Sequence, residues 1–97
     1  MQYYLKVKNP SGELLDVLVE GNPDSTQAVI MAHGFGTDKH EHGLFDSLVD
    51  ILSPNHLTIR FDFSGYGNSE GNQVDVNYHK QAKDLGSIIA WTNSKIP

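Results

Sequence analysis

The chain has 97 residues, which suits a single domain, and its apolar fraction of 38% is compatible with a packed core. The formal net charge of -5 and the lack of any lysine- or arginine-rich run argue against nucleic acid or an anionic membrane surface as the main partner. The chain has no cysteine, which excludes disulfides, thiolate metal sites and cysteine nucleophiles.

The first part of the chain predicts an antiparallel hairpin over residues 3–20. Apolar residues partly alternate in YYLKVK and LLDVLVE, and the NPSG segment between them is rich in turn formers. The next strand is predicted over 28–33, because AVIMAHG begins with a short, continuous apolar run typical of a strand buried on both faces.

Helical spacing follows this strand and predicts a helix over 41–52, with Pro54 just past its end. Its apolar face comprises Leu44, Phe45, Leu48, Val49 and Leu52. LTIRFDF predicts a second inner strand over 57–63, and a second helix is predicted over 76–94. The stripe expected to pack into the core comprises Tyr78, Ala82, Leu85, Ile89 and Thr92.

The order of these elements predicts the fold class. Strands that alternate with helices indicate an α/β domain, here over 1–97, with helices covering a mostly parallel sheet. No stretch approaches about 18 apolar residues, and the start MQYYLKVKNP lacks the apolar core of a signal peptide. We therefore expect a soluble cytoplasmic protein.

The GNSEG segment at 67–71 matches G-x-S-x-G, the motif around the nucleophilic serine of many hydrolases. A nucleophile elbow needs a strand that turns directly into a helix, and here loop residues lie on both sides of the motif. Asp75 and His79 follow in triad order, but they are too close in sequence to come from the ends of different strands. The sequence favours Ser69 as a loop serine that hydrogen-bonds nearby backbone, with a nucleophilic Ser69 as the weaker alternative.

Two further ligand-binding interpretations fail on spacing. Gly65, Gly67 and Gly71 loosely mimic a dinucleotide-binding loop, but they do not open a helix at once, and no acidic residue ends a following strand. His40 and His42 would not converge on one metal ion, and no other ligand pair is evident. The sequence predicts no cofactor and no metal, and a polar, solvated helix start.

Two motifs, AVIMAHGFG and LTIRFDFSGYGNSEG, together resemble the first part of the α/β-hydrolase fold. The resemblance is closest to serine esterases of the cinnamoyl and feruloyl esterase or monoacylglycerol lipase kind. The second motif follows that family's D-x-x-G-x-G-x-S-x-G pattern at Asp62, Gly65, Gly67, Ser69 and Gly71. In the family, the nucleophile elbow comes one strand later, and the catalytic acid and histidine later still. The resemblance therefore implies that Ser69 is not the nucleophile.

The resemblance also implies one catalytic position. The backbone N–H of Phe35 would serve an oxyanion hole for a small ester substrate. Independently, Gly34 and Gly36 would let the backbone approach a ligand closely. His33 is expected to brace the loop, and Asp62 to orient loop backbone together with Arg60.

In the resembling fold the first four strands are ordered 1-2-4-3, which would leave the strand at 28–33 on a bare edge. We expect Val29, Ile30 and Met31 to be exposed there, and the chain to form a homo-oligomer or to pair with a complementing chain. Two functions stay open: the N-terminal segment of an ester hydrolase whose nucleophile lies elsewhere, or a non-catalytic module that self-associates or binds a partner.

Overall fold

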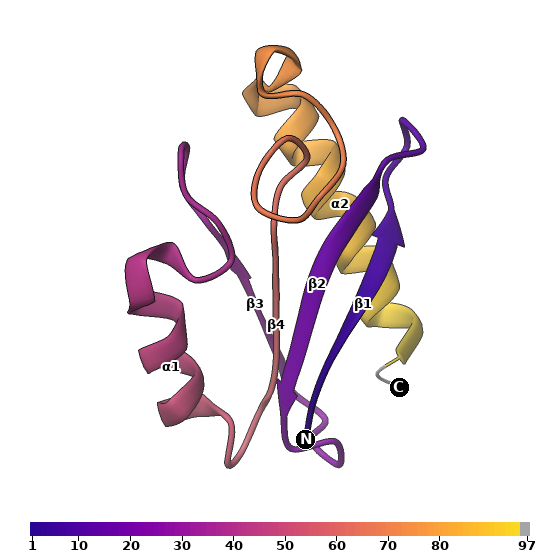
Figure 1. The fold of residues 1–97 in the computed structure, drawn as a ribbon. Helices are drawn as coiled ribbons and strands as arrows, with labels where there is room; N and C mark the ends of the chain where they lie inside the picture. Colours follow the sequence, from indigo (N-terminus) through magenta and orange to yellow (C-terminus); the bar gives the residue numbers. More distant parts are fainter. Residues whose placement is uncertain (96–97) are drawn as a thin grey trace.

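The computed structural model describes residues 1–95, so the last two residues of the predicted domain lie outside the described part. The strands are β1 (Gln2–Lys8), β2 (Leu14–Gly21), β3 (Ala28–Ala32) and β4 (Leu57–Phe61). The helices are α1 (Leu44–Leu52) and α2 (Tyr78–Lys95), and two short 3-10 turns are η1 (Glu41–Gly43) and η2 (Gln73–Asp75). Figure 1 shows this arrangement.

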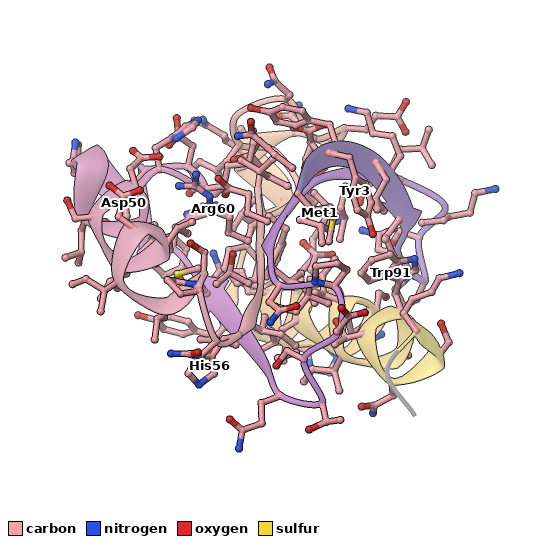
Figure 2. All side chains as sticks on the ribbon, turned by 90° about the horizontal axis from the view of Figure 1, so that it is seen from below. Met1, Tyr3, Asp50, His56, Arg60 and Trp91 are labelled. Carbon is pink, nitrogen blue, oxygen red and sulfur yellow. The ribbon has the colours of Figure 1, made fainter. Side chains whose placement is uncertain are left out.

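The strands form one sheet in the order β1-β2-β4-β3. β1 pairs with β2 and β2 with β4 in antiparallel fashion, while β3 and β4 are parallel. The predicted α/β class and strand order are confirmed. The prediction of a mostly parallel sheet is wrong, because two of the three pairings among the described strands are antiparallel and one, between β3 and β4, is parallel. Helix α1 covers one face and α2 the other (Figures 1 and 2).

The alternation along the strands explains why both faces are covered. On the α2 face lies the larger apolar cluster, formed by Val7, Leu15, Val17, Val19, Leu57, Ile59, Phe61, Phe63 and Ile88. On the α1 face, Met31 packs against Phe45 and Val49. Seen from below in Figure 2, Arg60 lies toward α1 and Trp91 lies on α2.

The predicted helix at 41–52 is interrupted near its start. Glu41 and His42 have φ values of 46° and 55°, in the left-handed region, so the regular helix begins only at Leu44. Strand β4 ends at Phe61, two residues earlier than predicted. The Asp62 amide makes one more hydrogen bond to β2, at the Asp16 carbonyl, but the Phe63 amide donates to the His33 side chain instead of to a strand. The second helix begins at Tyr78, since Val76 is extended.

The predicted core stripe of the last helix is only partly correct: Thr92 is buried and Leu85 packs against the larger apolar cluster, but the other three members are exposed. Tyr78 is 78% exposed and Ile89 43% exposed, whereas Asp84 and Ile88 are fully buried. The helix is rotated so that the Asp84 carboxylate accepts hydrogen bonds from the Asn9 side chain at 2.8 Å and the Ser64 amide at 2.9 Å. These polar contacts and Ile88 decide which face packs on the sheet.

Strand β3 is an edge strand, with β4 as its one partner among the described strands. The prediction that its apolar side chains are exposed is wrong, because Met31 is buried beneath α1 and both Val29 and Ile30 are partly buried. The open edge is therefore mainly backbone. None of the helices within residues 1–95 is long and apolar enough to cross a membrane.

Candidate functional site

Two loops meet where the parallel strands β3 and β4 end, at the upper end of the sheet in Figure 1. One loop runs over residues 33–40 and the other over 62–72. Ligands in open α/β sheets bind beyond the carboxyl ends of the strands, so this edge is the candidate site.

His33 joins the two loops. It is only 4% exposed, and its Nε2 accepts a hydrogen bond from the Phe63 amide at 3.0 Å. Because Nε2 is the acceptor, the ring proton lies on Nδ1, which donates to the Gly34 carbonyl at 2.7 Å. The ring also meets Phe63 and Tyr66 edge to face. These are the contacts that a loop-bracing residue makes.

Asp62 is fully buried and accepts hydrogen bonds from both loops. Its Oδ1 accepts from the Lys39 amide at 2.7 Å, and its Oδ2 accepts from the Asn68 amide at 2.9 Å. The absent side chain of Gly67 leaves room for this carboxylate, since a Cβ at residue 67 would overlap it. Asp62 thereby fixes the backbone of both loops.

Lys39, which the sequence analysis did not single out, supplies the countercharge. It is 3% exposed, and its Nζ lies 2.8 Å from Asp62 and 2.9 Å from Asp16. Burial works against the charged form, but the hydrogen bonds and charges of Asp62 and Asp16 outweigh it and raise the pKa of Lys39 above its ordinary value. Lys39 therefore remains a cation that ties the loops to β2.

Arg60 also lies beneath the loops. Its guanidinium is 2.8 Å from Glu20 and 2.6 Å from Asp46 of α1, and it donates to the Lys39 carbonyl at 3.4 Å. These contacts connect β2, α1 and the first loop through one buried side chain.

The Ser69 hydroxyl is occupied by backbone groups. It donates to the Asp62 carbonyl at 2.6 Å and accepts from the Asp16 amide at 2.7 Å. No hydrogen bond within residues 1–95 joins Ser69 to Asp75 or His79. In this geometry the hydroxyl links the second loop to β2 by hydrogen bonds.

Phe35 lies at the tip of the first loop. Its side chain is 49% exposed and rests edge-on against Tyr78, with ring centroids 5.1 Å apart. Within residues 1–95 its backbone N–H donates to no acceptor. Gly36 and Gly65, on the first and second loops, have φ values of 78° and 83°, which favour glycine. The site thus presents a free amide on a loop held by side chains on both sides.

Two surface hollows differ in position. One of about 410 Å³ opens between the loops and is lined by Gly36, Thr37, Asp38, His40, His42, Tyr66, Gly67 and Gln73. A larger one of about 480 Å³ lies at the opposite end of the sheet, where Met1 and Asp50 contribute to its lining; Figure 2 labels these two residues. The smaller hollow is the relevant one, because it adjoins the carboxyl ends of the parallel strands.

His40 and His42 are the side chains that the sequence raised as candidate metal ligands. Among residues 1–95 no group of three or more histidine, aspartate or glutamate side chains is placed to hold a metal ion. Within that range His40 instead contacts Asp46 at 3.0 Å.

Solved structures share this architecture. An esterase from Pyrococcus furiosus superposes with a TM-score of 0.86 at 19% identity, over 97% of this chain and 35% of its own. The α/β-hydrolase GrgF from Penicillium sp. sh18 gives 0.84 at 19% identity, over 95% of this chain and 32% of its own. The chain has an α/β-hydrolase fold. It spans about a third of the length of these two structures.

The sequence comparisons are narrower. No protein-family model matches the sequence. A Mycobacterium tuberculosis protein named "Probable oxidoreductase EphD" is 36% identical over 63 residues, which are 65% of this chain and 10% of that protein. The matched segment is therefore a small part of a much longer relative.

Proposed function

We propose that this chain is the N-terminal segment of a serine-dependent carboxylic-ester hydrolase and that it contributes one oxyanion donor, the Phe35 N–H. The free amide at the tip of a braced loop carries the proposal. The similarity in fold to an esterase over nearly the whole chain supports it.

In this proposal the chain's residues hold and present a hydrogen-bond donor. The Phe35 N–H would donate to the carbonyl oxygen of an ester as negative charge develops there. One such donor is typically worth about 2.7–4 kcal/mol in the transition state. The nucleophilic serine, the acid, the catalytic histidine and the second donor would come from outside residues 1–97. His33, Asp62 and Ser69 would keep the two loops in place, with Gly65 and Gly67 allowing their turns.

The first test is the coding sequence. We expect it to continue past residue 97 into a strand followed directly by a G-x-S-x-G turn and a helix. If no such segment is encoded there or on a neighbouring gene, the hydrolase proposal fails.

The second test is kinetic and uses the assembled hydrolase with a nitrophenyl ester. Phe35→Pro removes the N–H and should lower kcat on the order of 10²–10³-fold. Phe35→Ala keeps the N–H and serves as the matched control, with much smaller loss. Equal effects of both variants would refute the donor role. Fluorophosphonate labelling of Ser69 in this chain, lost in Ser69→Ala, would also overturn the assignment.

A second candidate function is a non-catalytic module that pairs with another chain or with itself. The open backbone edge of β3 favours it, since an unpaired strand edge is a template for pairing. We expect the chain to sediment as a dimer or larger species. Val29→Lys on β3 should shift it toward monomer, while Tyr3→Lys on β1, the other edge strand, should not. A monodisperse monomer that melts cooperatively would count against this candidate.

We further propose that the protein works in the cytoplasm, with a small ester as ligand and without nucleic acid or membrane as partner. The net charge of -5 and the lack of a lysine- or arginine-rich run argue against nucleic acid and anionic membrane surfaces as partners. Cell fractionation with an antibody to the chain would test the location, and recovery in the membrane or secreted fraction would contradict it.

A further inference from the structure

Three consecutive residues before α1 have positive φ values: Glu41 at 46°, His42 at 55° and Gly43 at 91°. The left-handed region is free for glycine but disfavoured for residues that carry a Cβ. A conformation of this kind persists only where surrounding contacts compensate for it. The contacts of Glu41 supply that compensation.

The left-handed turn directs the Glu41 carboxylate back onto the first loop. Its Oε2 accepts a hydrogen bond from the Gly34 amide at 2.6 Å. The Thr37 hydroxyl lies 3.0 Å from the same oxygen. A short, charge-assisted bond to a backbone amide is among the stronger hydrogen bonds in proteins.

The next peptide group along the loop contains the Gly34 carbonyl and the Phe35 N–H. The carbonyl accepts from His33 Nδ1 at 2.7 Å, and the Thr37 hydroxyl and amide approach it at 2.9 and 3.4 Å. Within residues 1–95 all peptide bonds are trans, so the Phe35 N–H points away from this anchored carbonyl. Contacts on both sides of Gly34 thus decide where the free N–H points.

We propose that Glu41 is a positioning residue for the Phe35 N–H: by holding the Gly34 amide, it presets the donor before any ligand arrives. The catalytic use of this donor rests on the proposed function, whereas the positioning of the N–H by Glu41 rests on the contacts described above. Glu41 does not touch the ligand in this scheme.

The charge of Glu41 is secured by its surroundings. The hydrogen bond from the Gly34 amide is the largest influence and lowers the pKa of Glu41; partial burial opposes it, and the hydrogen bond from Thr37 and the nearby His42 add to the lowering. His33 and His42 are the titratable side chains that face the carboxylate. The restraint should therefore persist to pH values below 4.5, the ordinary value for a glutamate.

The test is ¹H–¹⁵N NMR of the 97-residue chain, in whichever assembly it forms in solution. We expect the Gly34 amide proton to resonate far downfield and to titrate with a midpoint below 4.5. Glu41→Ala should shift the Gly34 and Phe35 amide resonances, and Glu41→Gln should restore much of the Phe35 position while abolishing the titration. Glu70→Gln is the matched control. Glu70 lies on the second loop and likewise accepts a hydrogen bond from a backbone amide, that of Leu14 at 2.8 Å.

The proposal is overturned if the Phe35 amide keeps its position in Glu41→Ala, or if Glu70→Gln moves it as far. It is also overturned if the wild-type Gly34 amide does not titrate, a measurement that stays decisive should Glu41→Ala fail to fold. None of these readouts involves ester hydrolysis. Failure of the kinetic tests above would therefore leave the positioning role standing, and its failure would leave the hydrolase proposal intact.

Discussion

Two buried cations hold the site loops, and each is paired with carboxylates. Lys39 lies between Asp16 and Asp62, while Arg60 lies between Glu20 and Asp46. A buried ion pair gains little over well-packed apolar residues, but removing one partner leaves an uncompensated charge. Removing one partner of a buried pair should therefore lower the free energy of unfolding far more than removing one partner of an exposed pair.

Lys39→Met is the sharpest case. It keeps the length of the side chain but leaves the fully buried Asp62 without its cation, so we expect the free energy of unfolding to fall by about 3–5 kcal/mol. Lys6→Met is the control: Lys6 also bonds Asp16, but its side chain is 46% exposed, and the loss should be at most about 1 kcal/mol. Urea unfolding of both variants measures the difference, and similar losses would contradict the argument.

Gly67 and Gly12 form a second pair for comparison. Both have positive φ, but a Cβ at Gly67 would overlap the Asp62 carboxylate, whereas one at Gly12 would meet nothing within 4 Å. We expect Gly67→Ala to cost about 2–5 kcal/mol, from backbone strain plus overpacking, and Gly12→Ala about 1 kcal/mol from strain alone. Thermal unfolding distinguishes them. Equal costs would mean that the fit around Asp62 is loose.

The sequence identified the glycines and Asp62 but missed Lys39, Glu41 and Asp84. The glycines stand in a recognisable local pattern, whereas two of the missed residues bond distant positions: Asp84 bonds Asn9, 75 positions away, and Lys39 bonds Asp62, 23 positions away. Glu41 bonds Gly34, only seven positions away, but through a left-handed turn that the helical spacing of the sequence does not reveal. One local signal was available for Asp84, since it shares the i, i+4, i+8 spacing of Ile88 and Thr92. Long-range partners of this kind have no signal in a single sequence.

At the scale of elements, the type of each helix and strand was predictable and its packing face was not. The apolar runs of β3 and β4 predict buried strands because both faces of the sheet are covered by helices. In α2, by contrast, apolar spacing alone misplaced the buried face, because Asp84 is buried while Tyr78 and Ile89 are exposed.

The rotation of α2 can be tested with two adjacent isoleucines. Ile88 is fully buried in the larger apolar cluster, so Ile88→Ala should lower the free energy of unfolding by about 2–5 kcal/mol. Ile89 is 43% exposed, and Ile89→Ala should cost less than about 1 kcal/mol. Chemical denaturation of the two variants compares them. A larger loss for Ile89→Ala than for Ile88→Ala would mean that the helix buries the face predicted from the sequence.

Ion pairs occur throughout the molecule and give its stability a definite dependence on pH. Hydrogen bonds from Asn9 and then Lys80 lower the pKa of Glu13. Those from His40 and then Arg60 lower the pKa of Asp46. Burial alone would raise the pKa of Asp16, but Lys6 and Lys39 lower it by more. Each of these three carboxyl groups is thus more easily ionised in the folded chain than in the unfolded one.

A carboxylate with a lowered pKa stabilises the fold above its unfolded-state pKa and loses that contribution as pH falls through the folded-state value. We expect the free energy of unfolding to decline below about pH 4.5, as Glu13 and then Asp16 and Asp46 protonate. Lys39 and Lys80 have raised pKa values, so their contribution should disappear above pH 10.5. Urea midpoints measured from pH 2.5 to 11.5 test both limbs, and a midpoint unchanged at pH 3 would contradict the first.

The contacts of Lys39 have a consequence for the order of folding. Its cation bridges Asp16 on β2 and Asp62 after β4, two strands that are paired but far apart in sequence. The bridge can close only after these strands have met, so it belongs after the rate-limiting step. Lys39→Met should then speed unfolding and leave the refolding rate nearly unchanged, a φ-value near zero that stopped-flow kinetics can measure. The loops that present the Phe35 amide would thus be among the last parts of the chain to order and the first to loosen.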